Sequence, residues 1–472
     1  LLYSSKNNNV ILKSINDFIN KPTESLNLIL YKNIINEIAI KRNNKCLVLE
    51  EYIKESVSYI TYNNIETAKH YFTIETLQFL DLENQINKKD KKRDLKKLKI
   101  GITFDVPKTL NDFYSNGIRQ NIIILRELFE KCGNVEKAYI VNVTDVKIDP
   151  SSDSPLSRYA DNIINIKEVQ DKCDLIVVCH GSLLPEEYAK FASSGIRIVK
   201  LALGSQQSIF TETVLFKPNE KAFGIYTRNK HVKNIWTSPH FYDNEKYFHE
   251  ALFDCEVLKA PYVWDPRFIE EYADIQKKTQ NVDSLYKPSG EKAKRLGTFE
   301  PNINYVKNCV VPTIISEKFY RKYPDLLKFS YIYNTKELRS KKDFIQFCKD
   351  LDSHINGKLF FQDSFVIMHA LPKFTDILLS HQDGCALNYL YLDAAWFGYP
   401  VVHNSRLMKE LGWYYPEYSV DIAVEHLKNI SENFDSQHEK YLAKSRKYAE
   451  KYFITNKKNI KGFEVLIEGA MK

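Results

Sequence analysis

The segment Leu379–Asn404 (LSHQDGCALNYLYLDAAWFGYPVVHN) holds the pattern that is most informative about chemistry. It reads as a strand, a polar loop with Gly384, a buried helix, a tight turn at Gly398-Tyr399-Pro400 and a second strand. The loop would present backbone N–H groups, and the start of the helix adds the positive end of its dipole. This arrangement predicts a site for an anion such as a diphosphate.

Asp393 lies inside the otherwise apolar helix of this segment. A carboxylate in such a place is unusual unless it binds a pair of hydroxyls or a buried donor, because an uncompensated polar group is costly to bury. The alternative is an ion pair with an Arg or Lys of the core. The sequence pattern favours neither interpretation over the other.

A second constellation is the loop Thr298-Phe299-Glu300-Pro301-Asn302, which follows a strand. It precedes a helix expected over 305–323, and Asn302 or Asn304 is the expected N-cap of that helix. Capping and turn formation alone would explain Asn302 without any ligand.

In the first half of the chain, Asp105 ends one predicted strand and Cys179-His180-Gly181-Ser182 ends another. Ligands of open parallel sheets bind at this carboxyl edge. We expect His180 there to act as a general base on a hydroxyl, with a purely structural histidine as the alternative. The dipeptide Asn116-Gly117 opens the first long helix and is also a common turn.

No metal site is expected from the sequence. The eight cysteines are scattered without a CxxC pair, which indicates reduced thiols. Asp350 and Asp352 have the spacing of a metal-dependent diphosphate site, but they precede a strand and so fall at the wrong edge of the sheet. We expect amides and cations to neutralise a diphosphate instead, and the candidate cations are Arg295, Arg406 and Lys409.

Two stretches of alternating strands and helices must position these residues. Short Val/Ile-rich runs separated by helical spacings are typical of a parallel sheet covered on both faces. The first set of predicted strands is 99–106, 138–143, 174–180 and 196–203, and the second is 295–299, 329–333, 359–361, 376–380 and 400–403. The sequence therefore predicts an α/β fold of two doubly wound, Rossmann-like domains facing a cleft, over 99–265 and 295–416.

Three further regions flank these domains. Residues 1–86 are predicted to form a helical accessory region, and 417–472 are predicted to be helices that pack back across the domain junction. The basic run 87–98 is interpreted as a solvated linker. The alternative is that the lysines and arginines of 88–99 bind nucleic acid.

Composition sets broad limits. The 472 residues are 44% hydrophobic and 27% charged with net charge +7, as in a globular protein that favours anionic ligands. The 30 Tyr and 27 Phe residues suit clefts that bind sugars. No apolar run approaches about 18 residues, so no membrane span and a cytoplasmic location are expected. The chain opens with Leu1 rather than Met, from which we expect a processed product or a piece of a larger protein.

The segment ending in Gly398-Tyr399-Pro400-Val401-Val402 resembles the donor-site segment of GT-B glycosyltransferases. This register places Asp393 at the second Glu of the Glu-x7-Glu pair of retaining members, which binds the ribose. The first Glu falls at Cys385, so either that carboxylate is missing or Asp383 replaces it. With His381-Gln382 and Leu387-Asn388, the segment is most similar to an uncharacterised bacterial and viral branch of GT-B proteins.

The resemblance implies a glycosyltransferase that uses a nucleotide-sugar, UDP- or GDP-linked, with no other cofactor and no metal. Glu300 and Asn302 would then line the donor site, and Asn116 and Gly117 would approach the donor phosphates or the acceptor. The acceptor, the sugar, the stereochemistry and the oligomeric state stay open. The alternatives are a sugar-nucleotide epimerase or a phosphorylase on the same fold, or a non-catalytic protein that binds nucleic acid.

Overall fold

The computed structural model describes residues 97–114, 117–148, 155–216 and 228–472. These belong to one compact unit, Lys96–Lys472. The predicted helical region 1–86, the basic run up to Lys96 and Asn116 lie outside the described residues. No helix in the described part of the chain is both long enough and apolar enough to cross a membrane.

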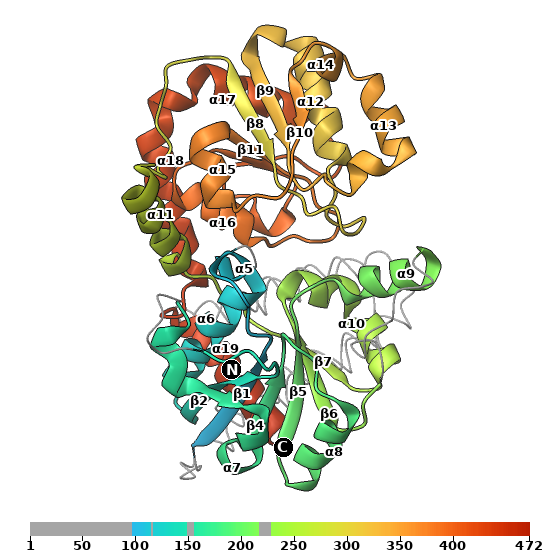
Figure 1. The fold of residues 1–472 in the computed structure, drawn as a ribbon, viewed down its shortest axis with the longest axis vertical. Coiled ribbons are helices and arrows are strands. Elements are labelled where there is room, and N and C mark those ends of the chain that lie inside the picture. Colours follow the sequence, from blue (N-terminus) through green and yellow to red (C-terminus); the bar gives the residue numbers. More distant parts are fainter. Residues whose placement is uncertain (1–96, 115–116, 149–154, 217–227) are drawn as a thin grey trace, which may run out of the picture. The chain divides into compact units, whose positions relative to one another are not determined.

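The first half forms a sheet of seven parallel strands in the order β3-β2-β1-β4-β5-β6-β7 (Figure 1). In chain order the strands are β1 Leu98–Phe104, β2 Val135–Asn142, β3 Ile163–Asn165, β4 Leu175–Val178, β5 Arg197–Ala202, β6 Val232–Thr237 and β7 Glu256–Lys259. The helices are α5 Leu110–Tyr114, α6 Gly117–Lys131, α7 Val169–Lys172, α8 Pro185–Ser193, α9 Gln206–Phe216, α10 Pro239–Phe253 and α11 Arg267–Gln280.

Both faces of this sheet are buried. Within β4, Leu175 and Val177 belong to one hydrophobic cluster, whereas Ile176 and Val178 belong to another. Successive side chains of a strand point to opposite faces, so a strand covered on both sides must be apolar throughout. The four-residue run Leu-Ile-Val-Val of β4 meets that requirement, as predicted from the sequence.

The second half forms a second parallel sheet, with six strands in the order β10-β9-β8-β11-β12-β13. In chain order the strands are β8 Lys294–Thr298, β9 Leu327–Ile332, β10 Leu359–Phe361, β11 Ile377–Leu379, β12 Val401–His403 and β13 Trp413–Tyr414. The helices are α12 Val310–Lys322, α13 Lys342–Lys349, α14 Asp352–Ile355, α15 Ile367–Phe374, α16 Tyr389–Trp396, α17 Val420–Asn433, α18 His438–Ala449 and α19 Lys457–Ala470.

The strand order of each sheet is that of a Rossmann-like doubly wound domain. The predicted pair of Rossmann-like domains is therefore confirmed, and the fold is of the GT-B type.

The last helix, α19, packs on the first sheet although the three preceding helices belong to the second (Figure 1). Phe463 of α19 contacts the rings of Phe129 and Trp236 at centroid distances of 5.3 and 6.4 Å. Glu464 accepts a hydrogen bond of 2.7 Å from the backbone N–H of Gly133. The C-terminal helix thus completes the core of the first sheet.

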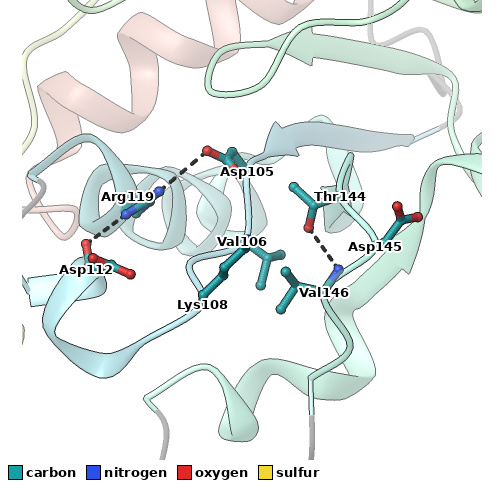
Figure 2. A pocket seen from close by; sticks show the side chains of 8 residues that line it. All are labelled: Asp105, Val106, Lys108, Asp112, Arg119, Thr144, Asp145 and Val146. Carbon is teal, nitrogen blue, oxygen red and sulfur yellow. Dashed lines mark hydrogen bonds and ion pairs between the residues drawn. The ribbon is translucent and has the colours of Figure 1, made fainter.

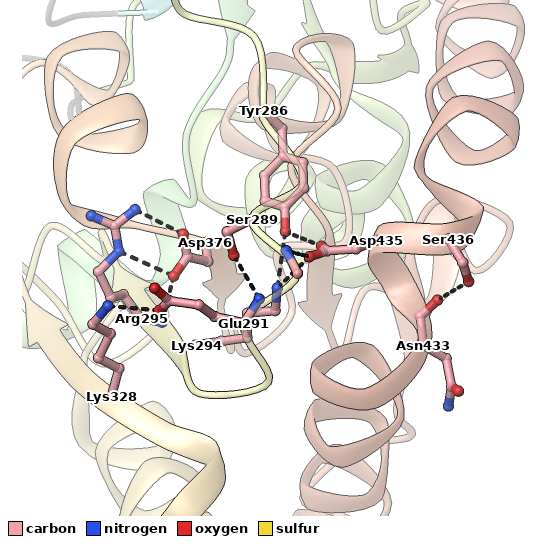
Figure 3. A network of polar contacts seen from close by, with 11 residues as sticks. Tyr286, Ser289, Glu291, Lys294, Arg295, Lys328, Asp376, Asn433, Asp435 and Ser436 are labelled. Carbon is pink, nitrogen blue, oxygen red and sulfur yellow. Dashed lines mark hydrogen bonds and ion pairs between the residues drawn. The ribbon is translucent and has the colours of Figure 1, made fainter.

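The connection into the second sheet is fixed by polar contacts to the turn after α17 (Figure 3). Asp435 accepts hydrogen bonds from Tyr286 Oη at 2.7 Å and from the backbone N–H of Gly290 at 2.8 Å. The ammonium of Lys294, only 1% exposed, lies 3.0 Å from the same carboxylate. Arg295 pairs with Asp376 at 2.7 Å. Both cations lie at the start of β8, opposite the carboxyl edge, so the expected phosphate role of Arg295 does not fit its position.

Candidate functional site

Glu300 lies at the carboxyl edge of the second sheet, just after β8, and is completely buried. Ser380 Oγ donates to one carboxylate oxygen, and Gln382 Nε2 donates to the other at 2.9 Å. Burial raises the pKa of Glu300 to about 7, although these donors and Lys307 act in the opposite direction. Glu300 therefore ties the end of β8 to the residues that follow β11.

His381 and Asp383 follow β11 at the same edge. His381 is 2% exposed, and its Nδ1 lies 3.0 Å from Tyr415 Oη. Its Nε2 lies 3.5 Å from Asp383 Oδ1, which also accepts a hydrogen bond from Tyr418 Oη. Burial pushes the pKa of Asp383 upward, but the bonds from His381 and Tyr418 outweigh it, and the net pKa is lowered. Asp383 is thus held as an anion.

The loop from Gly384 to Asn388 leads into α16 as predicted. Gly384 has a φ of 66°, a left-handed conformation that favours glycine. Asn388 is the N-cap of α16, and its Oδ1 accepts a hydrogen bond of 3.1 Å from the backbone N–H of Leu390. Leu387 is buried in the hydrophobic core. The start of α16 therefore faces the carboxyl edge of the sheet, where an anion would meet its N–H groups.

Asp393 is buried in α16, and its Oδ1 accepts a hydrogen bond of 2.8 Å from Trp264 Nε1. Burial raises the pKa of Asp393 to about 7, and the indole N–H acts in the opposite direction. Of the partners considered for this carboxylate, the structure supplies a buried donor rather than a cation. A ribose could reach Asp393 only beside or in place of this indole.

Asn302 serves the backbone of its own loop. It has a φ of 57°, its Oδ1 accepts a hydrogen bond of 2.8 Å from the backbone N–H of Cys309, and its Nδ2 donates to the carbonyl of Asn334 at 3.1 Å. The predicted helix start at 305 is wrong, because α12 begins at Val310. The loop between β8 and α12 is therefore longer than expected. The side chain of Asn302 stabilises it by binding the backbone of Cys309 at its far end.

The sequence prediction missed Lys307, which lies in this longer loop. Burial raises the pKa of Glu300 and of Cys385, and the charge of Lys307 opposes the rise in both, so Lys307 lies near the end of β8 and the loop before α16. Lys307 and Arg406 also contribute to the low pKa of His240, about 3, of which burial is the main cause. The sequence signal that could have identified Lys307 is a lysine shortly before the start of a helix, in a loop at the carboxyl edge of the second sheet.

His240 comes from the first half of the chain, at the start of α10. It is 2% exposed, and its Nδ1 has no hydrogen-bond partner among the described residues. The next residues also contact the second half, since Asn244 Nδ2 donates to the carbonyl of Gly384 at 2.9 Å. The start of α10 therefore lies against the loop that precedes α16.

His180 and Asp105 lie together at the carboxyl edge of the first sheet. Thr103 Oγ1 donates to the carbonyl of Gly181 and accepts from the backbone N–H of Cys179, both at 3.0 Å, which fixes the chain around His180. Burial lowers the pKa of His180, while Asp105 raises it and Arg119 lowers it. His180 Nδ1 has no hydrogen-bond partner in the part of the chain that is described. A neutral imidazole of this kind can accept a proton.

A pocket of about 580 Å³ opens beside Asp105 (Figure 2). Arg119 lies between Asp105, 3.4 Å from its carboxylate, and the carbonyl of Asp112, to which it donates at 3.0 Å. The lining residues are Asp105, Val106, Lys108, Asp112, Arg119, Thr144, Asp145 and Val146. The ends of β1 and β2 thus form a polar hollow of a size that suits a small ligand.

Gly117 lies against the ring of Tyr389, the first residue of α16. A Cβ atom at Gly117 would lie 3.1 Å from Tyr389 Cδ2. Asn121 of α6 donates a hydrogen bond to Tyr389 Oη. The starts of α6 and α16 are therefore neighbours.

No group of three or more His, Cys, Asp or Glu side chains that could hold a metal ion occurs among the described residues. Asp352 instead begins α14 and pairs with Arg321 at 2.6 Å. Asp350 ends α13. Both precede β10, at the edge opposite the candidate site.

Sequence comparison places these residues in a family. A model described as "Protein of unknown function (DUF2827)" matches residues 100–467. The chain belongs to the DUF2827 family. The match runs from β1 into α19, so the DUF2827 unit contains both sheets and the returning helix. No curated protein matches this DUF2827 chain in sequence.

Solved structures similar to this DUF2827 chain include enzymes of two kinds. An O-GlcNAc transferase mutant from Thermobaculum terrenum has TM-score 0.47 and 11% identity, covering 80% of this chain and 68% of its own. Trehalose 6-phosphate synthase from Burkholderia multivorans has TM-score 0.47 and 10% identity, covering 80% and 98%. UDP-GlcNAc 2-epimerase from Neisseria meningitidis has TM-score 0.37 and 11% identity, covering 79% and 99%. Likeness at this level does not assign a reaction.

Proposed function

We propose that this DUF2827 chain is a glycosyltransferase that moves a sugar from a nucleotide-sugar donor to an acceptor hydroxyl. The donor binds at the carboxyl edge of the second sheet, and its base is uracil or guanine. The acceptor binds at the carboxyl edge of the first sheet, in the pocket beside Asp105. Lys307, Arg406 and the amides at the start of α16 take the place of a metal ion on the diphosphate.

One observation carries this proposal. Lys307 and Arg406 come from two segments at the carboxyl edge of the second sheet, where the carbonyl of Val306 accepts a hydrogen bond of 2.9 Å from the backbone N–H of Asp383 and Arg406 lies 3.5 Å from Asp243 of α10. The loop between Gly384 and Asn388 lies between them, because Ser405 Oγ donates to the carbonyl of Ala386 and Lys307 acts on Cys385. Two cations around the start of a helix form an anion site that a diphosphate fits.

We assign roles to Asp393, His180 and Asp105 from their positions. Asp393 binds the ribose and must exchange or share the bond from Trp264. His180, kept neutral by burial and Arg119, accepts the proton of the acceptor hydroxyl, and Asp105 stabilises the imidazolium that forms. A neutral base at pH 7 is the form that this step requires.

Ligand-induced thermal stabilisation tests the donor site. The wild-type chain is melted with UDP, GDP and their common sugar derivatives, beside Lys307→Ala, Asp393→Ala and the control Lys349→Ala at the exposed end of α13. One nucleotide should stabilise the wild type and the control by about 2.7 kcal/mol at about a hundred times its Kd. Both site variants should lose this stabilisation. No stabilisation by any nucleotide, in a chain that melts cooperatively, would refute the proposal.

A second candidate is a sugar-nucleotide epimerase. The gathering of His381, Asp383 and Glu300 at one edge favours it, since an epimerase needs several acids and bases around one sugar carbon. Incubation with each nucleotide-sugar in the absence of acceptor separates the two reactions. An epimerase yields an isomeric nucleotide-sugar, whereas a transferase leaves the donor unchanged or hydrolyses it slowly.

A further inference from the structure

Two exposed tyrosines flank Asp383 at the edge of the second sheet. Tyr305 is 58% exposed and Tyr418 is 61% exposed. Tyr418 Oη donates a hydrogen bond to Asp383 Oδ1. On the other side, the backbone N–H of Asp383 donates to the carbonyl of Val306 at 2.9 Å, which places Tyr305 one residue from this contact. The Tyr418 side chain therefore contacts the Asp383 carboxylate, and the loop that carries Tyr305 contacts the Asp383 backbone. The Tyr305 hydroxyl also acts electrostatically on that of Tyr418, so the two tyrosines lie in the same neighbourhood.

The Tyr418 ring packs on protein on one side and is otherwise open to solvent. The Tyr418 ring lies 4.8 Å from the His381 ring, centroid to centroid, at an angle of 39°. Ile303, two residues before Tyr305 in the same loop, is also 65% exposed. Open aromatic faces around a single carboxylate resemble a ligand site in which apolar walls bind and one polar group orients.

The ligand must combine apolar faces with hydrogen-bond donors at its edge. A phosphate is excluded, because the Asp383 carboxylate would repel it at short range. A pyranose ring fits, since its C–H faces stack on aromatic rings and its hydroxyls donate to a carboxylate. We propose that Tyr305 and Tyr418 form the walls of a binding site for a pyranose ring, with Asp383 accepting a hydrogen bond from a ring hydroxyl. The inference rests on the proposed function only for the origin of that ring, which is the donor sugar or a saccharide acceptor.

Saturation-transfer NMR with uncharged methyl glycosides of glucose and N-acetylglucosamine tests the site without any nucleotide. The wild type is compared with Tyr305→Ala, Tyr418→Ala and Tyr418→Phe, and with the control Tyr247→Ala, whose ring is 76% exposed on α10. Both site alanine variants should bind a glycoside roughly fivefold to tenfold more weakly. Tyr418→Phe should keep most of the affinity because the ring remains. The control should match the wild type.

A second measurement identifies the source of the ring and keeps the two proposals separable. The affinities of UDP, GDP and their hexose derivatives are measured for the same variants. If Tyr418→Ala weakens the hexose derivatives together with the glycosides but leaves UDP and GDP unchanged, the site holds the donor sugar; if it weakens the glycosides alone, it holds a saccharide acceptor. Both results support the inference. Glycoside binding without nucleotide binding would refute the glycosyltransferase proposal alone.

Two results would overturn the pyranose site. One is that neither alanine variant changes the binding of any glycoside or sugar nucleotide. The other is that Tyr418→Ala weakens UDP or GDP as strongly as their hexose derivatives, which would show that the rings hold the base.

Discussion

Glu300 and Asp393 are acids that folding removes from water, and the pKa of each is raised to about 7. Each carboxyl ionises at a lower pH in the unfolded chain than in the folded one. The free energy of unfolding is therefore unaffected while both states are protonated, and it falls as pH rises from about 4 to about 7. These two side chains make the fold less stable at neutral pH than at weakly acidic pH, a cost typical of functional sites.

Glu300→Gln should remove the part of this pH dependence that comes from Glu300. The amide cannot ionise, so the fall in unfolding free energy between about pH 4 and pH 8 should shrink by about 3 kcal/mol. Gln382 can adapt, because its Oε1 has no hydrogen-bond partner among the described residues and a flipped amide can accept from the new donor. Denaturant melts across this pH range measure the effect, with the exposed Glu337→Gln as control. An unchanged pH profile would contradict the assignment.

Trp264→Phe should destabilise the chain by about 1–3 kcal/mol, because the buried carboxyl of Asp393 loses its indole donor. The loss of unfolding free energy should be larger at pH 8 than at pH 5, since burying the ionised carboxylate without a donor is more unfavourable than burying the protonated acid. Asp393→Asn provides the matched background. If the pH-dependent part of the penalty persists in Trp264→Phe combined with Asp393→Asn, the hydrogen bond is not its cause.

The sequence located these residues better than it explained them. An apolar helix around Asp393 indicated a buried partner, but Trp264 lies 129 residues away, and no local pattern connects the two. The role of Asn302 was harder to see, because its partner Cys309 belongs to a loop whose length was misjudged and its other partner, Asn334, follows β9. Contacts between distant segments depend on the packing of whole elements.

At the scale of the element, Gly181 joins the end of β4 to the edge that carries His180. Its φ is 90°, and an added Cβ would lie 2.3 Å from Val143 Cγ2 and 3.3 Å from the backbone N of Asp105. Gly181→Ala should therefore cost about 2–4 kcal/mol, from both a strained φ and a steric clash. Gly195→Ala is the control, since Gly195 has a φ of 81° with no atom within 4 Å of the added Cβ.

Gly195→Ala should lower the free energy of unfolding by only about 1 kcal/mol, because only the left-handed conformation is unfavourable there. Urea unfolding of both variants measures the difference, and the NMR signals of His180 report whether its ring has moved. Equal costs for the two glycines would show that Val143 yields without strain and that the close packing at Gly181 has no energetic role.

Strands with an apolar run were predicted from the sequence more readily than short strands or strands of mixed composition. β4 is Leu-Ile-Val-Val and was found, whereas β7 is Glu-Val-Leu-Lys at the end of the sheet and was missed. β13 has only two residues, Trp413 and Tyr414. An edge strand has fewer neighbours to bury it, so its sequence carries less of the signal that identifies central strands.

At the scale of the whole molecule, the first sheet depends on residues near position 463. Phe463→Ala should cost about 3–5 kcal/mol, because it leaves a cavity between Phe129 and Trp236. Hydrogen exchange should show faster opening of β1 and α6, although the altered residue follows the entire second sheet in sequence. Val465→Ala, at an exposed position of the same helix, should leave exchange unchanged. Faster exchange confined to α17 and α18 would contradict this view of α19.

The docking of α19 also bears on how the chain is made. The strands of the first sheet leave the ribosome long before Phe463 and Glu464 are synthesised. Phe129 and Trp236 therefore lack the packing of Phe463 while the entire second domain is translated. A nascent chain at that stage displays apolar surface that chaperones and proteases recognise. Early termination before Lys457 would thus yield a product that is degraded rather than a stably folded first domain.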